Sequence, residues 1–304
     1  MAATRPWWRP RKSGGWAIVL SVAVTSVFVV GVSLIPMPAP YVFIELNAEL
    51  VRYRVARQAL AGITVTDATY VGEIDCPGTV AADGRLSGLL APAAGTAVDY
   101  RWTPKGVAIT VSNPGEGLAS FTFPDGAACN FTGATVTIAQ HGATARGLHL
   151  PIAGRAQAGS ENSVATASTA PQGTIHAGKV TVFGRTLMGH ELYPVTGATY
   201  PVPAGSRLAS GVDFLSADAE EGGAAWYGSA RPGERGLLVS ATTDTTRLLL
   251  YRPGLDDQTE TFSFGLLTRI FNDPGLGLLT LFLGTFFLLA GAVTAWMSQW
   301  STAR

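Results

Sequence analysis

Apolar and polar residues alternate with a period of two over much of the chain between residues 36 and 275. Such alternation is typical of strands that bury one face. The pattern predicts strands at residues 49–55, 63–71, 96–103, 107–112, 119–123, 134–139, 147–152, 179–183, 207–214, 226–229, 236–242 and 246–252. Pro104-Lys105-Gly106 and Pro232-Gly233 separate two pairs of these strands and suit tight hairpin turns. Many short strands joined by Gly and Pro predict an all-β domain, a sandwich or a roll. A β-solenoid is the alternative, but the sequence shows no fixed repeat that would support it.

Three segments leave alternatives open. Residues 155–173 are small and polar and predict either a linker or a long loop. A linker would divide the chain into two β-rich lobes, at 36–154 and 174–275, whereas a loop would leave one. Residues 41–57 fit a helix or a strand, and we favour a strand from about Glu49. Residues 261–271 fit an interfacial helix or a last strand equally well.

Two uncharged apolar runs, residues 15–35 and 276–297, interrupt this pattern. Each is long enough for a helix that crosses the roughly 30 Å hydrocarbon layer of a bilayer. The sequence therefore predicts an all-β ectodomain flanked by two transmembrane helices. A cleaved signal peptide is the alternative for the first run, which is longer than most signal sequences.

The placement of charge predicts an orientation for these two runs. Five positive residues lie in the flanking segments 1–14 and 298–304, and all 21 acidic residues lie between the runs. The positive-inside rule then places both termini in the cytoplasm and the middle of the chain outside. Because arginine far outnumbers lysine and Ala and Gly are abundant, we expect a bacterial protein of the cytoplasmic (inner) membrane, its β domain periplasmic or extracellular.

The chain has two cysteines, Cys76 and Cys129. Both fall in the part predicted to lie in an oxidising compartment, which favours one disulfide between them. Two buried free thiols are the alternative.

Small residues at four-residue spacing occur in both apolar runs and favour close helix packing. These helix-packing candidates are Ala17, Ser21, Thr25, Gly291 and Ala295.

No hydrolase, nucleotide-binding or zinc-protease motif is present, and the four histidines lack ligand spacing. The sequence thus predicts neither a metal site nor a cofactor. The middle of the chain is mildly acidic and has no basic cluster, so nucleic acid is not an expected partner. Aromatic residues suited to stacking on a sugar ring are the ligand-binding candidates, namely Tyr100, Trp102, Trp226 and Tyr227.

Two functional hypotheses follow. The favoured one is a non-catalytic accessory subunit, held in the lipid bilayer, whose β module binds a membrane-protein partner or an envelope glycan. The alternative is a tethered enzyme that cleaves or modifies glycans with paired carboxylates.

Overall fold

A computed structural model describes residues 39–75, 84–112, 118–159, 174–186, 191–210, 224–245, 247–252, 259–263 and 272–302. Strands dominate the described chain. They are β1 (Tyr41–Ala48), β2 (Leu50–Val55), β3 (Ile63–Asp75), β4 (Arg85–Pro92), β5 (Ala97–Thr103), β6 (Gly106–Ser112), β7 (Ala119–Thr122), β8 (Ala128–His141), β9 (Leu150–Ala158), β10 (Ile175–Arg185), β11 (Leu192–Val202), β12 (Arg207–Ala209), β13 (Ala225–Pro232), β14 (Leu237–Asp244), β15 (Arg247–Tyr251) and β16 (Thr259–Ser263). The helical elements are the short η1 (Gln58–Leu60), α2 (Gly142–Arg146) and α4 (Pro274–Thr302). The all-β character of the domain is thereby confirmed.

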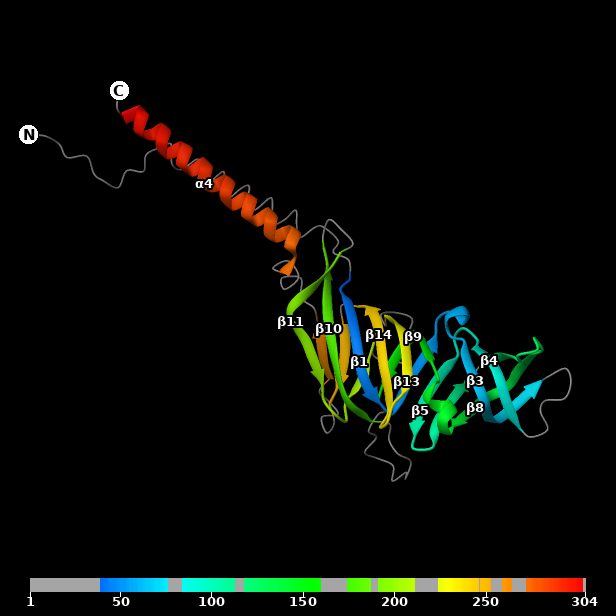
Figure 1. The fold of residues 1–304 in the computed structure, drawn as a ribbon. Coiled ribbons are helices and arrows are strands. Elements are labelled where there is room, and N and C mark those ends of the chain that lie inside the picture. Colours follow the sequence, from blue (N-terminus) through cyan, green and yellow to red (C-terminus); the bar gives the residue numbers. More distant parts are fainter. Residues whose placement is uncertain are drawn as a thin grey trace, which may run out of the picture. The chain divides into compact units, whose positions relative to one another are not determined.

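The strands hydrogen-bond into one continuous antiparallel sheet (Figure 1). Its order runs β11-β10-β1-β14-β13-β9-β2-β5-β6-β8-β3-β4-β7, and β12, β15 and β16 branch from β9. At one end the sheet closes on itself, because β7 pairs with both β4 and β8. All these strands belong to one compact unit, residues 39–185 and 191–272.

Residues 41–55 show how this sheet is built. Side chains alternate along a strand, and Val42, Ile44 and Leu46 of β1 are buried while the residues between them are half-buried. At Glu49 the chain bends from β1, which pairs with β10 and β14, into β2, which pairs with β5 and β9. Each large apolar side chain buried in this way contributes roughly 1.5–3 kcal/mol.

The segments for which the sequence allows more than one kind of structure form strands wherever they are described. Residues 41–48 form β1 rather than a helix, and residues 259–263 form β16. Strand β9 extends to Ala158, into the segment expected to be a linker or a long loop, and residues 160–173 lie outside the described part of the chain.

Helix α4 belongs to a second unit. Asp273 precedes it, and its Oδ1 accepts a hydrogen bond from the N–H of Gly275 at 2.8 Å, as an N-cap residue does. Pro274 occupies the first helical position, where its missing N–H costs nothing. The sequence Asp-Pro-Gly therefore explains where the helix begins.

The expectation of two transmembrane helices is contradicted. Among the described residues, no helix combines the length and the apolarity that crossing a bilayer requires. A span needs about 20 predominantly apolar residues. Residues 15–35, the other expected span, lie outside the described chain.

The same finding contradicts the predicted location, which was that of a two-pass protein of the inner membrane with both termini in the cytoplasm. Cys129 is disulfide-bonded rather than a free thiol, in agreement with the predicted oxidised state. Cys129 is buried in β8 at 3% exposure, and Cys76 lies outside the described residues.

Of the helix-packing candidates, Ala17, Ser21 and Thr25 also lie outside the described chain. Gly291 lies in α4, where an added Cβ would have no atom within 4 Å. Ala295 is in the same helix, but its side chain is not described.

Candidate functional site

A cleft of about 560 Å³ opens where three turns of the β unit meet. They are the β5–β6 turn, helix α2 with the end of β8, and the β13–β14 turn. The lining residues are Trp102, Thr103, Pro104, Lys105, Gly106, Gly142, Ala145, Arg146, Pro232, Gly233 and Glu234. A volume of this size lies within the range of about 300–1,000 Å³ that small-molecule sites occupy.

The β5–β6 turn forms the first wall. The hydroxyl of Thr103 donates a hydrogen bond to the carbonyl of Gly106 at 3.0 Å and closes the turn. Gly106 has φ +153°, and a Cβ there would overlap the carbonyl oxygen of Gln140 on the neighbouring strand β8. Only glycine allows this close approach. The turn thereby projects Lys105, which is exposed, at the mouth of the cleft.

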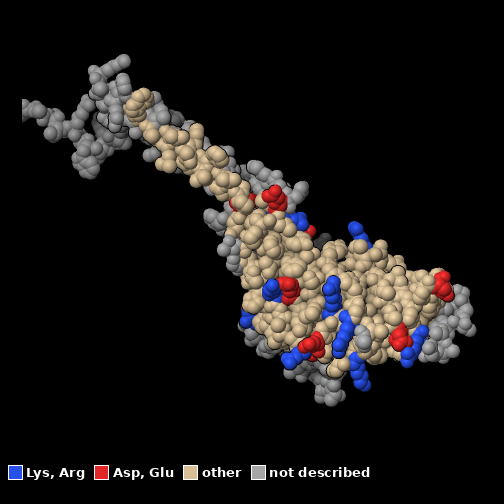
Figure 2. All heavy atoms as spheres, viewed as in Figure 1, with Lys and Arg blue, Asp and Glu red and all other residues tan. Residues whose placement is uncertain are grey.

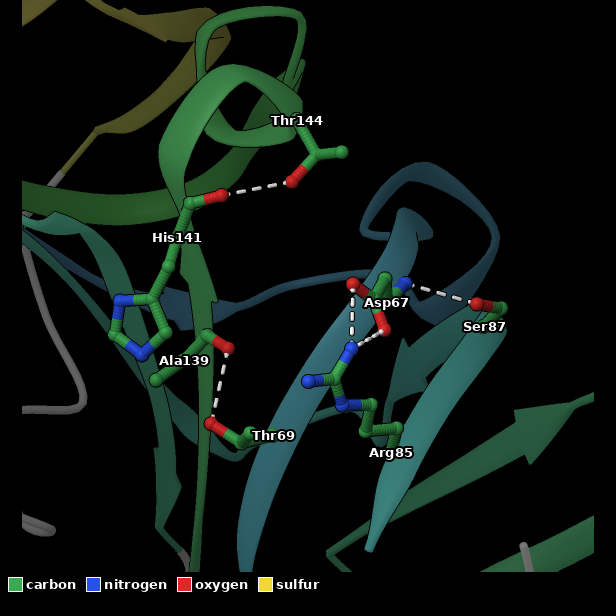
Figure 3. Close-up of polar contacts among 7 residues, drawn as sticks. All are labelled: Asp67, Thr69, Arg85, Ser87, Ala139, His141 and Thr144. Atoms are coloured by element: carbon green, nitrogen blue, oxygen red, sulfur yellow. Dashed lines mark hydrogen bonds and ion pairs between the residues drawn. The ribbon is translucent and has the colours of Figure 1, made fainter. Parts of the chain in front are cut away.

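Helix α2 forms the second wall, and its single turn is fixed by local hydrogen bonds. The Thr144 hydroxyl donates to the carbonyl of His141 at 2.8 Å (Figure 3), and the Gln140 amide donates to the carbonyl of Thr144 at 3.1 Å. Ala145 is buried at 3% exposure and anchors the helix to the core. Arg146, the last residue of the helix, is left exposed.

The β13–β14 turn forms the third wall. It is closed by a hydrogen bond from the N–H of Gly233 to the carbonyl of Gly236 at 2.7 Å. The carbonyl of Gly233 in turn accepts a hydrogen bond from the indole Nε1 of Trp102 at 3.2 Å. This contact joins β5 to a turn 131 residues further along the chain.

The walls are therefore tied to one another. Besides the Trp102–Gly233 contact, the N–H of Gly142 donates to the carbonyl of Lys105 at 3.2 Å and joins α2 to the β5–β6 turn. The N–H of Trp102 also donates to the carbonyl of Glu49 at 2.8 Å, which holds the end of β5 to the bend between β1 and β2. A site preformed in this way loses little conformational entropy when a ligand binds.

The charges of the cleft are mainly positive. Lys105 and Arg146 lie on two walls and Glu234 on the third, with Arg235 next to it in the chain. Within the described residues, none of the ion pairs involves Lys105 or Arg146. Both cations thus face solvent at the cleft.

The structure places the four predicted ligand-binding residues in different surroundings. Trp102 is half-buried and lines the cleft. Trp226 is fully buried in the core, and its Nε1 has no hydrogen-bond partner in the described chain. Tyr227 is 46% exposed on the outer face of β13, apart from the residues that line the cleft.

Tyr100 lies in the core and faces Tyr53. Their hydroxyl oxygens are 2.9 Å apart, and the Tyr100 hydroxyl donates to the carbonyl of Pro151 at 2.7 Å. Both side chains are at 0% exposure. Burial raises the pKa of both phenols above the ordinary value, because a phenolate would lose its solvation there. Tyr100 is a structural residue in this arrangement.

A second, more open hollow of about 760 Å³ lies on the outer face of β10, β1, β14 and β13. Its charged residues include Glu45 and Lys179, whose carboxylate and ammonium groups are 2.6 Å apart. Leu238 is 54% exposed in its lining. Since its walls are strand faces rather than interlocked turns, we regard the smaller cleft as the candidate site.

Several of the described acidic residues pair with cations. Arg52 binds Asp99 through two contacts of 2.6 Å, and Arg85 binds both carboxylate oxygens of Asp67 at 2.7 and 3.0 Å (Figure 3). Figure 2 shows the same mixture of basic and acidic side chains over one face of the molecule. Neither hollow contains two carboxylates among its described lining residues. The described chain also has no group of three residues able to hold a metal ion.

Sequence reasoning found Trp102 but missed Lys105, Arg146 and Glu234. Lys105 and Glu234 are the polar residues of two turns that the sequence predicts, so their exposure could have been foreseen. Their meeting could not, because it depends on the pairing of strands far apart in the chain. Helix α2 is too short to leave a helical pattern in the sequence.

No protein-family model matches the chain, and the comparisons with curated proteins and with solved structures find no match either. The class of protein therefore rests on the fold and the cleft alone. It is an all-β protein with a preformed cleft at the turns of its sheet.

Proposed function

We propose that the β unit is a non-catalytic binding module that holds a glycan in the cleft beside Trp102. The observation that carries this proposal is the position of the indole. Its N–H is bonded to Gly233, so the ring is fixed in one orientation, and the cleft that it lines has polar groups on its other walls.

A sugar ring presents an apolar face of C–H groups and an edge of hydroxyl groups. The apolar surface of an aromatic ring suits the first, and charged side chains and backbone carbonyls suit the second. Trp102, Lys105, Arg146 and Glu234 offer both kinds of contact within one cleft. The hydrogen bonds between its walls favour binding further, since the site is formed before the ligand arrives.

The distribution of acids favours binding over cleavage. Glycosidases generally use two carboxylates, about 5–9.5 Å apart, on either side of the scissile bond. Glu234 is the one acid among the described lining residues of the cleft. In the other hollow, Glu45 is engaged by Lys179. Two carboxylates in one site would have favoured the hydrolase hypothesis.

The test is calorimetric titration of the full chain with three hexasaccharides, of glucose, of N-acetylglucosamine and of galacturonate. We expect at least one to bind, and Trp102→Ala to weaken it at least tenfold, about 1.4 kcal/mol. Tyr227→Ala is the matched control, because it removes an exposed aromatic ring outside the cleft and should leave affinity unchanged.

Circular dichroism must show that both variants are folded. Should Trp102→Ala be unstable, Trp102→Phe keeps an aromatic face and should retain most of the affinity. The proposal fails if none of the three hexasaccharides binds, or if folded Trp102→Ala binds as tightly as the unmodified chain.

A further inference from the structure

We infer that the cleft selects acidic saccharides, those with carboxylate or sulfate groups, through Lys105 and Arg146. This inference rests on the proposed function and adds the class of ligand. It begins from the placement of two cations on two walls of one cleft, with a single carboxylate on the third.

The backbones that carry the two cations are joined directly. The N–H of Gly142, the first residue of α2, donates to the carbonyl of Lys105. Arg146 follows at the end of the same helical turn, and buried Ala145 holds that turn against the core. The backbone positions from which the two cations project are thus fixed by a hydrogen bond and a packing contact rather than by a long loop.

Some of the described cations of the β unit already have an acidic partner, and the two cations of the cleft do not. Arg52, Arg85 and Lys179 each face a carboxylate within 2.6–2.7 Å. None of the ion pairs among the described residues involves Lys105 or Arg146, although Glu234 lines the same cleft. An acidic ligand would supply the missing partner without breaking an existing ion pair.

The chemistry of the two side chains is complementary. A guanidinium group can bind both oxygens of a carboxylate or sulfate in one plane, whereas an ammonium group acts as a point charge with three donors. Glu234 can accept hydrogen bonds from sugar hydroxyls and would repel an acidic group placed against its own wall. The three charges together would fix the direction in which an acidic sugar enters the cleft.

The experiment compares the galacturonate hexamer with the uncharged glucose hexamer, which has the same length. We expect the full chain to bind the acidic hexamer at least tenfold more tightly at 50 mM NaCl. Because exposed charges are screened by salt, this preference should shrink several-fold at 300 mM.

Lys105→Ala and Arg146→Ala should each weaken binding of the acidic hexamer roughly five- to tenfold, and the double variant should remove the preference. Arg57→Ala is the matched control, because it removes an exposed cation that does not line the cleft. Lys105→Arg, which keeps the charge, should retain most of the preference and so separates a charge effect from a folding effect.

Two outcomes distinguish the inference from the function on which it rests. If both hexamers bind equally and Trp102→Ala still weakens both, the selection for acidic saccharides is wrong and the glycan-binding function remains. If the acidic hexamer is preferred but the double variant keeps that preference, the assignment to Lys105 and Arg146 is wrong. If no hexasaccharide binds, the proposed function itself fails.

Discussion

Tyr100 and Trp102 lie two residues apart on the same face of β5, yet they belong to different environments. Tyr100 is fully buried, and its hydroxyl contacts Tyr53 and the carbonyl of Pro151. Trp102 is half-buried at the edge of a cleft, although its N–H is also bonded to a backbone carbonyl. Strand alternation determines which face a residue occupies. Whether that face meets the core or a cleft depends on how far the residue lies from the end of the strand.

The neighbours of the two residues explain the difference. Tyr100 pairs with Val51 on one side and Ile109 on the other, so paired strands surround it. Trp102 is one residue from the end of β5, where it pairs with Val107 on one side but meets the bend at Glu49 on the other. We therefore expect Tyr100 to contribute mainly to stability and Trp102 mainly to binding.

The largest expected effect is that of Tyr100→Ala on stability. It should lower the free energy of unfolding by about 3–5 kcal/mol, as other large-to-small substitutions of buried aromatic residues do. Trp102→Ala should cost less than about half of that, because part of the indole already contacts solvent. Urea denaturation of the full chain, followed by far-UV circular dichroism, measures both values. Equal losses for the two variants would contradict the distinction between core and cleft.

Sequence reasoning predicts the fold better than the site. The expected strands at 96–103 and 107–112 correspond closely to β5 and β6, because alternation and a Pro-Lys-Gly turn are local signals. Strand β4 (Arg85–Pro92) was not expected, since Gly88 and Pro92 obscure its alternation. Strand β11 was missed for the same reason, as it contains Pro194 and Pro201.

The apolar run at 276–297 shows where local reasoning fails in another way. Freedom from charge over about 20 residues predicts a membrane span there, but among the described residues no helix is long and apolar enough to cross a bilayer. The cleft was missed because the strand order that joins its three walls is a property of the whole sheet. Trp102 could be named from its type alone, whereas Lys105 and Arg146 could not be distinguished from any other exposed cation.

A smaller expected effect concerns the wall of the cleft. Gly106→Ala places a Cβ against the carbonyl of Gln140 at a backbone φ of +153°, so β6 must shift away from β8. We expect a loss of about 2–3 kcal/mol in stability, as for other strained backbone positions, together with weaker glycan binding.

Gly142→Ala is the matched control for that substitution. Gly142 also has a positive φ, +67°, but an added Cβ would meet nothing within 4 Å. Gly142→Ala should lower the free energy of unfolding by about 1–2 kcal/mol, the usual penalty for a residue with a side chain in the left-handed conformation. If Gly142→Ala proved the more damaging of the two, close packing of the β5–β6 turn against β8 would not be what shapes the cleft.

The smallest expected effect is the response of the core to alkaline pH. Burial raises the pKa of Tyr53 and of Tyr100 in the folded protein, so both phenols keep their protons above pH 10, where the unfolded chain loses them. The folded state then binds more protons than the unfolded state, and stability must fall as the pH rises through about 10. Each phenol contributes at most about 1.4 kcal/mol of this loss between pH 10 and pH 11.

Urea denaturation at pH 8, 10 and 11 measures this loss of stability. The Tyr53→Phe variant then tests whether the paired tyrosines cause it. This variant has one ionisable phenol fewer in the core, so its stability should fall less steeply with pH, although it starts lower because Tyr100 loses a hydrogen-bond partner. Tyr227→Phe removes a hydroxyl from the exposed outer face and should leave the slope unchanged. An identical slope for Tyr53→Phe and the unmodified chain would mean that the paired tyrosines are not the source of the alkaline loss of stability, and that Tyr100 is not the sealed core residue that its contrast with Trp102 requires.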